Sequence, residues 1–493
     1  MNKDSAGVGS SLVAGAAWMI AMRWVMRCIG LLSTVVLARL LVPDDFGVVA
    51  IALIVVGLLE TVSYLGVDLA LIKDRQAGRD EFDSAWTIQL GQGVLIAALL
   101  LLCAPLVASF FNEPRAVAVV MALSVRPVID GLQNIGIVCF RKELDFAREF
   151  RFNLVAKLLG VVIQLGAAIT FRNYWALVVG MIAASFVATI LSYVMHPYRP
   201  RLSFARAGKI FSFSQWLLIA RVGSYLTSRV DEFMVGRLMG TGAMGGYRVA
   251  SELASAPTIE IIMPMRRALY PALSQVSDDP EAYQRTVAQT LAAVAVVCIG
   301  LGVGLACVAE LVVPLVLGPK WLTTIPVMRW LALLGATTAI ILVLEVPLWV
   351  ADRTKLSALI TWIELVILLP LVYLATVRWG VEGAAASRVL VSVLMLPVAA
   401  LALRSACGVG LLPLVKAVLR AALAGGLMAA AIVGTPSAQG SVALALALKV
   451  ILGGLVYTLT LWALWRLAGR PEGPEASTLQ WIQRTLRRRT ARR

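Results

Sequence analysis

The chain has 493 residues, of which 60% are hydrophobic and 15% are charged, and its formal net charge is +16. A soluble domain is only about 45–50% apolar, so this composition excludes an ordinary soluble protein. The basic residues lie mainly in short segments between long apolar runs, which argues against a nucleic-acid-binding domain. The first apolar segment is too long for the core of a signal peptide, and we expect it to remain as a membrane span.

Apolar runs longer than about 18 residues recur from one end of the sequence to the other, which is typical of membrane-spanning helices. We therefore predict an all-α integral membrane protein with about fourteen transmembrane helices. The predicted spans are 12–41, 46–72, 84–111, 115–140, 150–171, 174–196, 210–239, 243–272, 287–317, 323–350, 356–378, 382–404, 413–434 and 443–468.

The connecting segments alternate in charge. Segments such as RKELDFAREFR and RRALYPALSQVSDDPEAYQR are basic, whereas intervening ones such as VPDD and GTPSAQGS have at most one positive charge. Because basic loops remain in the cytoplasm, both termini are predicted to be cytoplasmic. The basic tail, residues 469–493, is interpreted either as an orientation signal or as a short helix on anionic lipid.

The second half of the sequence resembles the first. WMIAMR begins at Trp18 and WLLIAR begins at Trp216, and the same offset of 198 residues relates three further pairs without a gap. These pairs are Arg39 with Arg237, Gly47 with Gly245, and Ala52 with Ala250. Six predicted spans separate the copies, so the repeats are parallel, and a substrate path is expected between the two halves.

This repeat divides the chain into four predicted parts. They are an N-lobe of six helices at residues 1–200, a C-lobe of six helices at 201–404, two extra helices at 405–468, and the tail at 469–493.

Basic residues interrupt several spans. Arg23 and Arg27 lie four residues apart in the first span, and Arg221 occupies the position of Arg23 in the second copy. An arginine at the centre of a bilayer costs roughly 2.5–3.5 kcal/mol on insertion scales, so these side chains are expected to face a polar cavity instead of lipid. Arginine binds phosphate and carboxylate groups through two parallel hydrogen bonds. The candidate substrate-binding residues are Arg23, Arg27, Arg126, Lys157, Arg221 and Arg248.

Each of these residues has a structural alternative. Arg126 lies one helical turn before Asp130 and is equally expected to pair with it, and Arg229 is expected to be paired or to reach the interface. Glu60, Asp68, Glu252 and Glu345 are acids within predicted spans that are candidates for ion coupling, although structural pairing is the favoured interpretation of each. The sequence has no P-loop and no catalytic motif in a suitable context, so we predict no enzyme activity, no cofactor and no metal site.

Four stretches carry a family resemblance: LARLLVPDDFGVVAIA, YLGVDLALIK, GGYRVASELASAP and RRALYPALSQ. With them the chain resembles the polysaccharide transporters of the multidrug/oligosaccharidyl-lipid/polysaccharide exporter superfamily, in particular Wzx-type flippases of the colanic-acid exporter kind. The resemblance implies a V-shaped, cationic cavity between two six-helix lobes, with Arg23, Arg27, Arg221 and Arg248 in positions that fit it. Two extra C-terminal helices also fit the family.

The function implied by the resemblance is alternating-access transport in the bacterial inner membrane. Its substrate would be an oligosaccharide repeat unit of O-antigen, capsule or exopolysaccharide linked to undecaprenyl pyrophosphate, moved from the cytoplasmic to the periplasmic leaflet. The expected partners are this lipid-linked oligosaccharide, membrane lipids and a glycan polymerase or assembly complex, with no nucleic acid. The alternatives are a flippase of the lipid-linked peptidoglycan precursor, a cation-coupled drug antiporter, and a membrane polymerase or ligase acting on a lipid-linked glycan.

Overall fold

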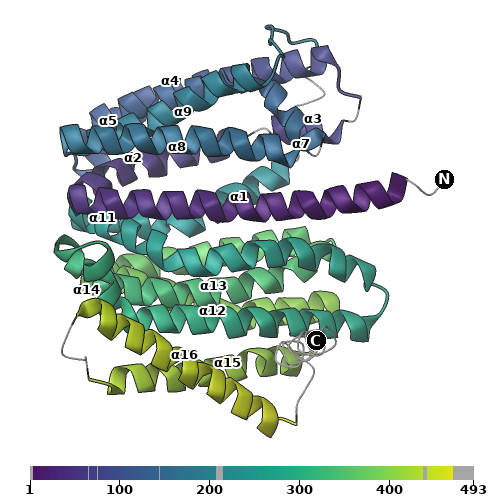
Figure 1. Cartoon of the computed structure of the whole chain (residues 1–493), viewed down its shortest axis with the longest axis vertical. Coiled ribbons are helices and arrows are strands. Elements are labelled where there is room, and N and C mark those ends of the chain that lie inside the picture. Colours follow the sequence, from purple (N-terminus) through teal and green to yellow (C-terminus); the bar gives the residue numbers. More distant parts are fainter. Residues whose placement is uncertain are drawn as a thin grey trace, which may run out of the picture. The chain divides into compact units, whose positions relative to one another are not determined.

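The computed structural model describes residues 4–64, 66–74, 76–143, 145–206, 215–436 and 441–469. Within these residues every regular element is a helix, which confirms the predicted all-α membrane fold (Figure 1). The chain forms two compact units, Met1–Arg248 and Val249–Arg493, called unit 1 and unit 2 below. The predicted domain limits at residues 200, 404 and 468 stay a prediction, and the tail from residue 470 lies outside the described residues.

Unit 1 contains the helices of the first half of the chain. Their bounds are α1 Asp4–Leu40, α2 Pro43–Ser63, α3 Val67–Lys73, α4 Arg79–Phe111, α5 Arg115–Leu123, α6 Val125–Gly131, η1 Ile135–Ile137, α7 Val138–Lys142, α8 Phe146–Phe171 and α9 Trp175–Met195. The helix α11, Gln215–Gln275, begins in unit 1 and continues into unit 2.

The remaining helices belong to unit 2. They are α12 Pro280–Val316, η2 Pro319–Thr324, α13 Ile325–Val350, α14 Thr354–Cys407, α15 Leu411–Gly434 and α16 Val442–Leu467.

Two of these helices are broken by a glycine. Gly240 in α11 has φ 80°, and Gly380 in α14 has φ 63°, so neither residue is helical. Glycine adopts positive φ without the steric penalty of a Cβ atom, which makes it the residue suited to such a break. Both breaks fall where the sequence predicts one span to end and the next to begin.

Nine helices of the described chain are long and apolar enough to cross a membrane, and the number is ten if the bent pair Arg115–Gly131 and Ile135–Lys142 is one span. The helix α14 counts once in this set although it contains two predicted spans. The helices α1 and α11, on which three further predicted spans fall, are outside the set. Within the described residues, each of the fourteen predicted spans falls mainly on helix.

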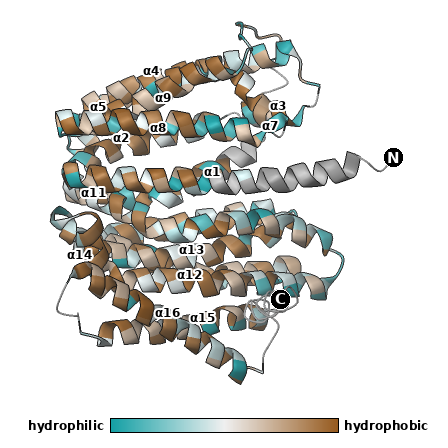
Figure 2. Cartoon of the chain, in the orientation of Figure 1, coloured by the Kyte–Doolittle hydropathy of each residue, from teal (hydrophilic) through white to brown (hydrophobic). Residues whose placement is uncertain are grey.

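The helices of each unit pack both against their neighbours in the sequence and against more distant helices. In unit 1, α8 packs against α9 and α1, and α4 packs against α5 and α6. In unit 2, α12 packs against α13 and α15, and α15 packs against α16. Hydrophobic residues dominate α4, α12, α15 and α16, whereas hydrophilic residues gather near helix ends and along parts of α11 (Figure 2). Burial of this apolar surface within each unit positions the few polar side chains described next.

Candidate transport site

The helices α1 and α8 bring three predicted basic residues to one packing interface of unit 1. Asn153 of α8 contacts Met22 of α1 at 3.8 Å from Nδ2 to Sδ, and Ser33 of α1 donates to Gln164 of α8 at 3.5 Å. Lys157 lies on the same face of α8 as Asn153 and Gln164, because residues four and eleven positions apart share a helix face. This face therefore lies against the helix that contains Arg23 and Arg27, both of which are half-buried.

A chain of polar contacts runs through unit 1 from α11 to α8. The guanidinium of Arg221 lies 4.0 Å from the centre of the Tyr64 ring, a cation–π distance. The Tyr64 hydroxyl donates to Asp68 at 3.1 Å, and Asp68 lies 3.9 Å from Arg141. Arg141 in turn forms a 2.6 Å ion pair with Glu149. We call these five residues the Arg221–Glu149 network; it joins three stretches that are far apart in the sequence, residues 64–68, residues 141–149 and residue 221.

A polar cavity of about 230 Å³ adjoins this network. Its wall includes three charged members of the network and several amide side chains, which can donate to and accept from hydroxyl groups of a sugar. The polar lining residues are Asp68, Gln89, Gln133, Asn134, Arg141, Glu149 and Asn153. Asn153 also contacts α1 next to Arg23, so the cavity lies close to the first of the predicted arginines.

Arg126 forms the ion pair with Asp130 that was the structural alternative to substrate binding. Its Nε lies 3.5 Å from the Asp130 carboxylate, one turn along α6, so the predicted pairing is confirmed. Arg126 and Asp130 are both electrostatic neighbours of Glu60 of α2. The predicted acid Glu60 thus has a cation, Arg126, nearby.

Arg248 is also paired. Its Nη1 lies 3.1 Å from the carboxylate of Glu232, which bonds at the same time to Arg229. The Glu232 side chain is only 4% exposed, so two arginines compensate one buried charge. The structural interpretation of Arg229 is thus confirmed.

In unit 2, the predicted acid Glu345 of α13 lies 3.5 Å from Arg266 of α11, and the Arg266 guanidinium lies 4.8 Å from the centre of the Trp349 ring. Structural pairing, the favoured interpretation of this acid, is therefore confirmed. Glu252 lies half-buried on α11 in the same unit.

Sequence reasoning did not identify Tyr64, Arg141, Glu149 and Arg266 as parts of these networks. Arg141 and Glu149 stand in the charged segment RKELDFAREFR, which was informative only about membrane orientation. Arg141 pairs with Asp68 of α3 and with Glu149 across the turn between α7 and α8. Neither contact produces a periodic pattern in the sequence, so these charges look like other loop charges. Arg266 belongs to the RRALYP segment, which charge counting assigned to a loop, although it lies within α11.

These features define a class of protein: a helical membrane protein whose apolar bundle contains ion-paired polar groups and a cavity. The structure of the lipid II flippase MurJ in an inward closed conformation has the same fold, with a TM-score of 0.74, 13% identity, and coverage of 91% of this chain and 99% of that chain. An inward-facing multidrug resistance MATE family transporter aligns with a TM-score of 0.56 and 14% identity, over 78% of this chain and 94% of that chain. At these identities the likeness shows the fold alone.

The family is settled by sequence. Residues 36–326, more than half of the chain, match the model of the "Polysaccharide biosynthesis protein" family, and the chain belongs to this family. The lipopolysaccharide biosynthesis protein WzxC of Escherichia coli K12 is 26% identical over 66% of this chain and 66% of its own length. The succinoglycan biosynthesis transport protein ExoT of Rhizobium meliloti is 23% identical over 60% of this chain and 61% of its own length.

Proposed function

We propose that this protein is a flippase that moves an undecaprenyl-pyrophosphate-linked oligosaccharide repeat unit across the bacterial inner membrane. The protein is a transporter and not an enzyme, in keeping with its family and with relatives named for lipopolysaccharide biosynthesis and succinoglycan transport. The repeat unit belongs to an O-antigen, a capsule or an exopolysaccharide. A polar glycan and its pyrophosphate do not enter hydrocarbon unaided, so transport requires polar groups inside the bundle.

The observation that carries the proposal is the polar cavity beside the Arg221–Glu149 network. The cavity supplies amide groups for sugar hydroxyls, and Arg141 and Arg221 supply positive charge for a phosphate. Both arginines are held by neighbours within unit 1, so a substrate phosphate would compete with the Asp68 and Glu149 carboxylates for Arg141. Exchange of Arg141 between these carboxylates and a phosphate would allow a substrate to be bound and then released.

The membrane orientation is part of the proposal. Both termini are cytoplasmic, and the cavity lies near the ends of α3 and α7, whose flanking loops are basic and assigned to the cytoplasm. A lipid-linked glycan would thus reach the cavity from the cytoplasmic leaflet. Arg23, Arg27 and Lys157 extend the basic surface along α1 and α8. A glycan polymerase or assembly complex is the expected protein partner.

The test is complementation in a host from which the gene has been deleted. We expect the deletion strain to lose one surface polysaccharide and to accumulate its lipid-linked repeat unit on the cytoplasmic leaflet. Arg23→Ala and Arg221→Ala should restore less than about a tenth of the polymer made by the wild-type gene, because each loses a charge-assisted contact of roughly 1.5–3 kcal/mol.

Arg378→Ala, which removes an exposed arginine of α14, is the matched control and should restore the polymer fully. Membrane levels of all variants are measured by immunoblot. Full restoration by both Arg23→Ala and Arg221→Ala would contradict the assigned roles. An unchanged polysaccharide in the deletion strain, with peptidoglycan precursor accumulating instead, would favour the alternative flippase.

A further inference from the structure

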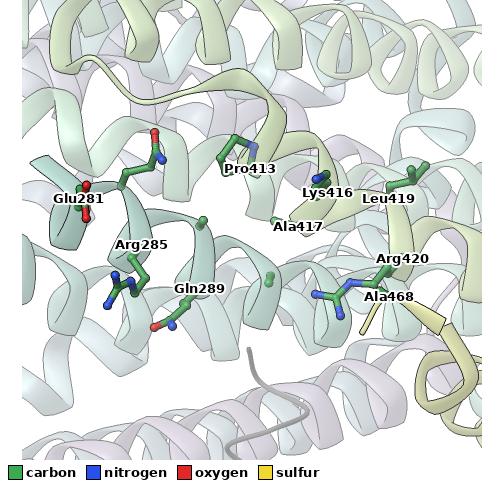
Figure 3. Close-up of a pocket in the computed structure, with 12 residues that line it drawn as sticks. Glu281, Arg285, Gln289, Pro413, Lys416, Ala417, Leu419, Arg420 and Ala468 are labelled. Carbon is green, nitrogen blue, oxygen red and sulfur yellow. The ribbon is translucent and has the colours of Figure 1, made fainter. Parts of the chain in front are cut away.

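Unit 2 contains a second, larger cavity that the transport site does not include. It has a volume of about 810 Å³ and lies between the first turns of α12, the first turns of α15 and the residue that follows α16 (Figure 3). The lining comes from Glu281 to Ala292 on α12, from Pro413 to Arg420 on α15, and from Ala468. We call it the α12–α15 pocket.

The charge of this pocket is positive. Its lining has three basic side chains, Arg285, Lys416 and Arg420, and one acidic side chain, Glu281. Among the residues that the structure describes, neither Arg285 nor Lys416 has a carboxylate within 4.0 Å, although Glu281 lies only one turn before Arg285. The helices α12 and α15 both begin here, so the positive ends of two helix dipoles add to the charge.

A hydrophobic stripe leads away from the pocket along α15. Leu419 lines the pocket and is 50% exposed, and Val415, Leu423 and Leu427 lie at four-residue intervals from it with exposures of 57%, 50% and 56%. Residues four apart share one face of a helix. This face is thus an open aliphatic track in a protein that lies in a bilayer, and hydrocarbon chains can lie against it.

The pocket also adjoins a helix end whose composition is typical of a membrane interface. At the adjacent end of α16 the guanidinium of Arg466 lies 3.9 Å from the centre of the Trp462 ring, and Trp462 is 45% exposed. Tryptophan and arginine are enriched at the membrane–water interface, where an apolar ring and a charge are both accommodated. The predicted topology puts this end on the cytoplasmic side.

We propose that the α12–α15 pocket binds the anionic phosphate headgroup of a membrane lipid, with the hydrocarbon chains of that lipid along the Leu419 stripe of α15. Basic pockets between transmembrane helices bind anionic headgroups through the same combination of charge and adjacent hydrocarbon. The phosphate belongs either to a bulk anionic phospholipid or to an undecaprenyl diphosphate carrier. Only the second source rests on the proposed function.

The experiment is native mass spectrometry of the purified full-length protein in detergent, titrated with defined lipids. Dioleoylphosphatidylglycerol is the anionic phospholipid, undecaprenyl diphosphate is the carrier, and dioleoylphosphatidylcholine is the zwitterionic reference. In Arg285→Gln/Lys416→Gln the dissociation constant of the anionic lipid should rise about 30-fold, because each basic residue near a membrane surface changes the affinity about fivefold.

Two further variants make the result specific. Lys320→Gln/Arg378→Gln removes two exposed cations outside the pocket and should leave the dissociation constant within about twofold, since only distant, screened charges are lost. Arg285→Lys/Lys416→Arg keeps the charge and should restore binding. Three results would each overturn the proposal. They are an unchanged dissociation constant in Arg285→Gln/Lys416→Gln, an equal loss of affinity in Lys320→Gln/Arg378→Gln, and equal binding of phosphatidylcholine.

The lipid that loses affinity identifies the source. A loss for both anionic lipids supports a site for phospholipid headgroups in general, and a loss for undecaprenyl diphosphate alone supports a site for the carrier. Because the readout is binding and not export, failure of this proposal leaves the proposed function untouched.

Discussion

At the scale of single residues, His196 shows how a side chain outside the bilayer is fixed by its surroundings. It is the C-cap of α9, as its place before Pro197 predicts, and its ring lies 5.9 Å from that of Phe140. Its Nδ1 accepts a hydrogen bond of 3.2 Å from the Tyr198 backbone N–H. This bond requires a ring nitrogen without a proton, so the folded protein favours neutral imidazole.

Burial lowers the pKa of His196 from its ordinary value of 6.5, and the positive charges of Arg148 and Arg199 act in the same direction while Glu143 opposes them. The unfolded chain therefore binds a proton at a higher pH than the folded protein does. The contribution of neutral His196 to the stability of the folded protein is therefore complete above the ordinary pKa. It is lost as the pH falls below that value.

We predict that the melting temperature of the protein in detergent falls more steeply between about pH 7.5 and pH 5.5 than that of His196→Gln, which cannot titrate. Differential scanning fluorimetry over this range provides the measurement. Parallel curves for the two proteins would show that His196 does not contribute.

At the scale of elements, the segment that follows α9 is held to α4 although it forms no helix. Asp83 accepts hydrogen bonds from the Tyr198 hydroxyl and, at 2.9 Å, from the Arg201 backbone N–H. Thr87 accepts from the Ser203 backbone N–H at 2.9 Å. Buried side chains of α4 thus replace the backbone partners that a helix or strand would supply.

We predict that Asp83→Ala destabilises the protein by about 2–3 kcal/mol, because it leaves a hydroxyl and a backbone N–H without their acceptor. It should also speed tryptic cleavage after Arg201, which is followed by Leu202. Asp80→Ala, which removes an exposed carboxylate one turn earlier in α4, is the control. Equal melting temperatures and equal cleavage rates in the two variants would contradict the role of this contact.

At the scale of the whole molecule, the internal repeat has a structural counterpart within unit 1. A Cβ atom on Gly47 would lie 1.8 Å from the Thr241 carbonyl oxygen, and one on Gly245 would lie 1.8 Å from the Pro43 carbonyl oxygen. Residues 43 and 241 are separated by the same 198 positions as residues 47 and 245. Two repeats related by a two-fold axis produce such a reciprocal contact, which supports the predicted parallel repeat.

We predict that Gly47→Ala and Gly245→Ala each destabilise the protein by about 3 kcal/mol or more, because a backbone oxygen cannot move away without shifting a helix. Gly91→Ala is the matched control, since a Cβ atom there meets nothing within 4 Å. Thermal unfolding in detergent measures all three. Similar effects in the three variants would mean that the close approach of α2 and α11 is unimportant.

The sequence by itself determined the class of fold, the spans and their breaks, because the apolarity needed to cross a bilayer and the glycine needed for a positive φ are local requirements. It also indicated which charges lie within the spans. The pairing of Arg126 with Asp130, one turn away, was also predictable, but only the tertiary structure decided how other charges are compensated: Arg248 by Glu232, and Glu345 by Arg266. A buried charge is neutralised by whichever partner packing brings within about 4 Å, and that partner can come from another helix at any distance along the chain.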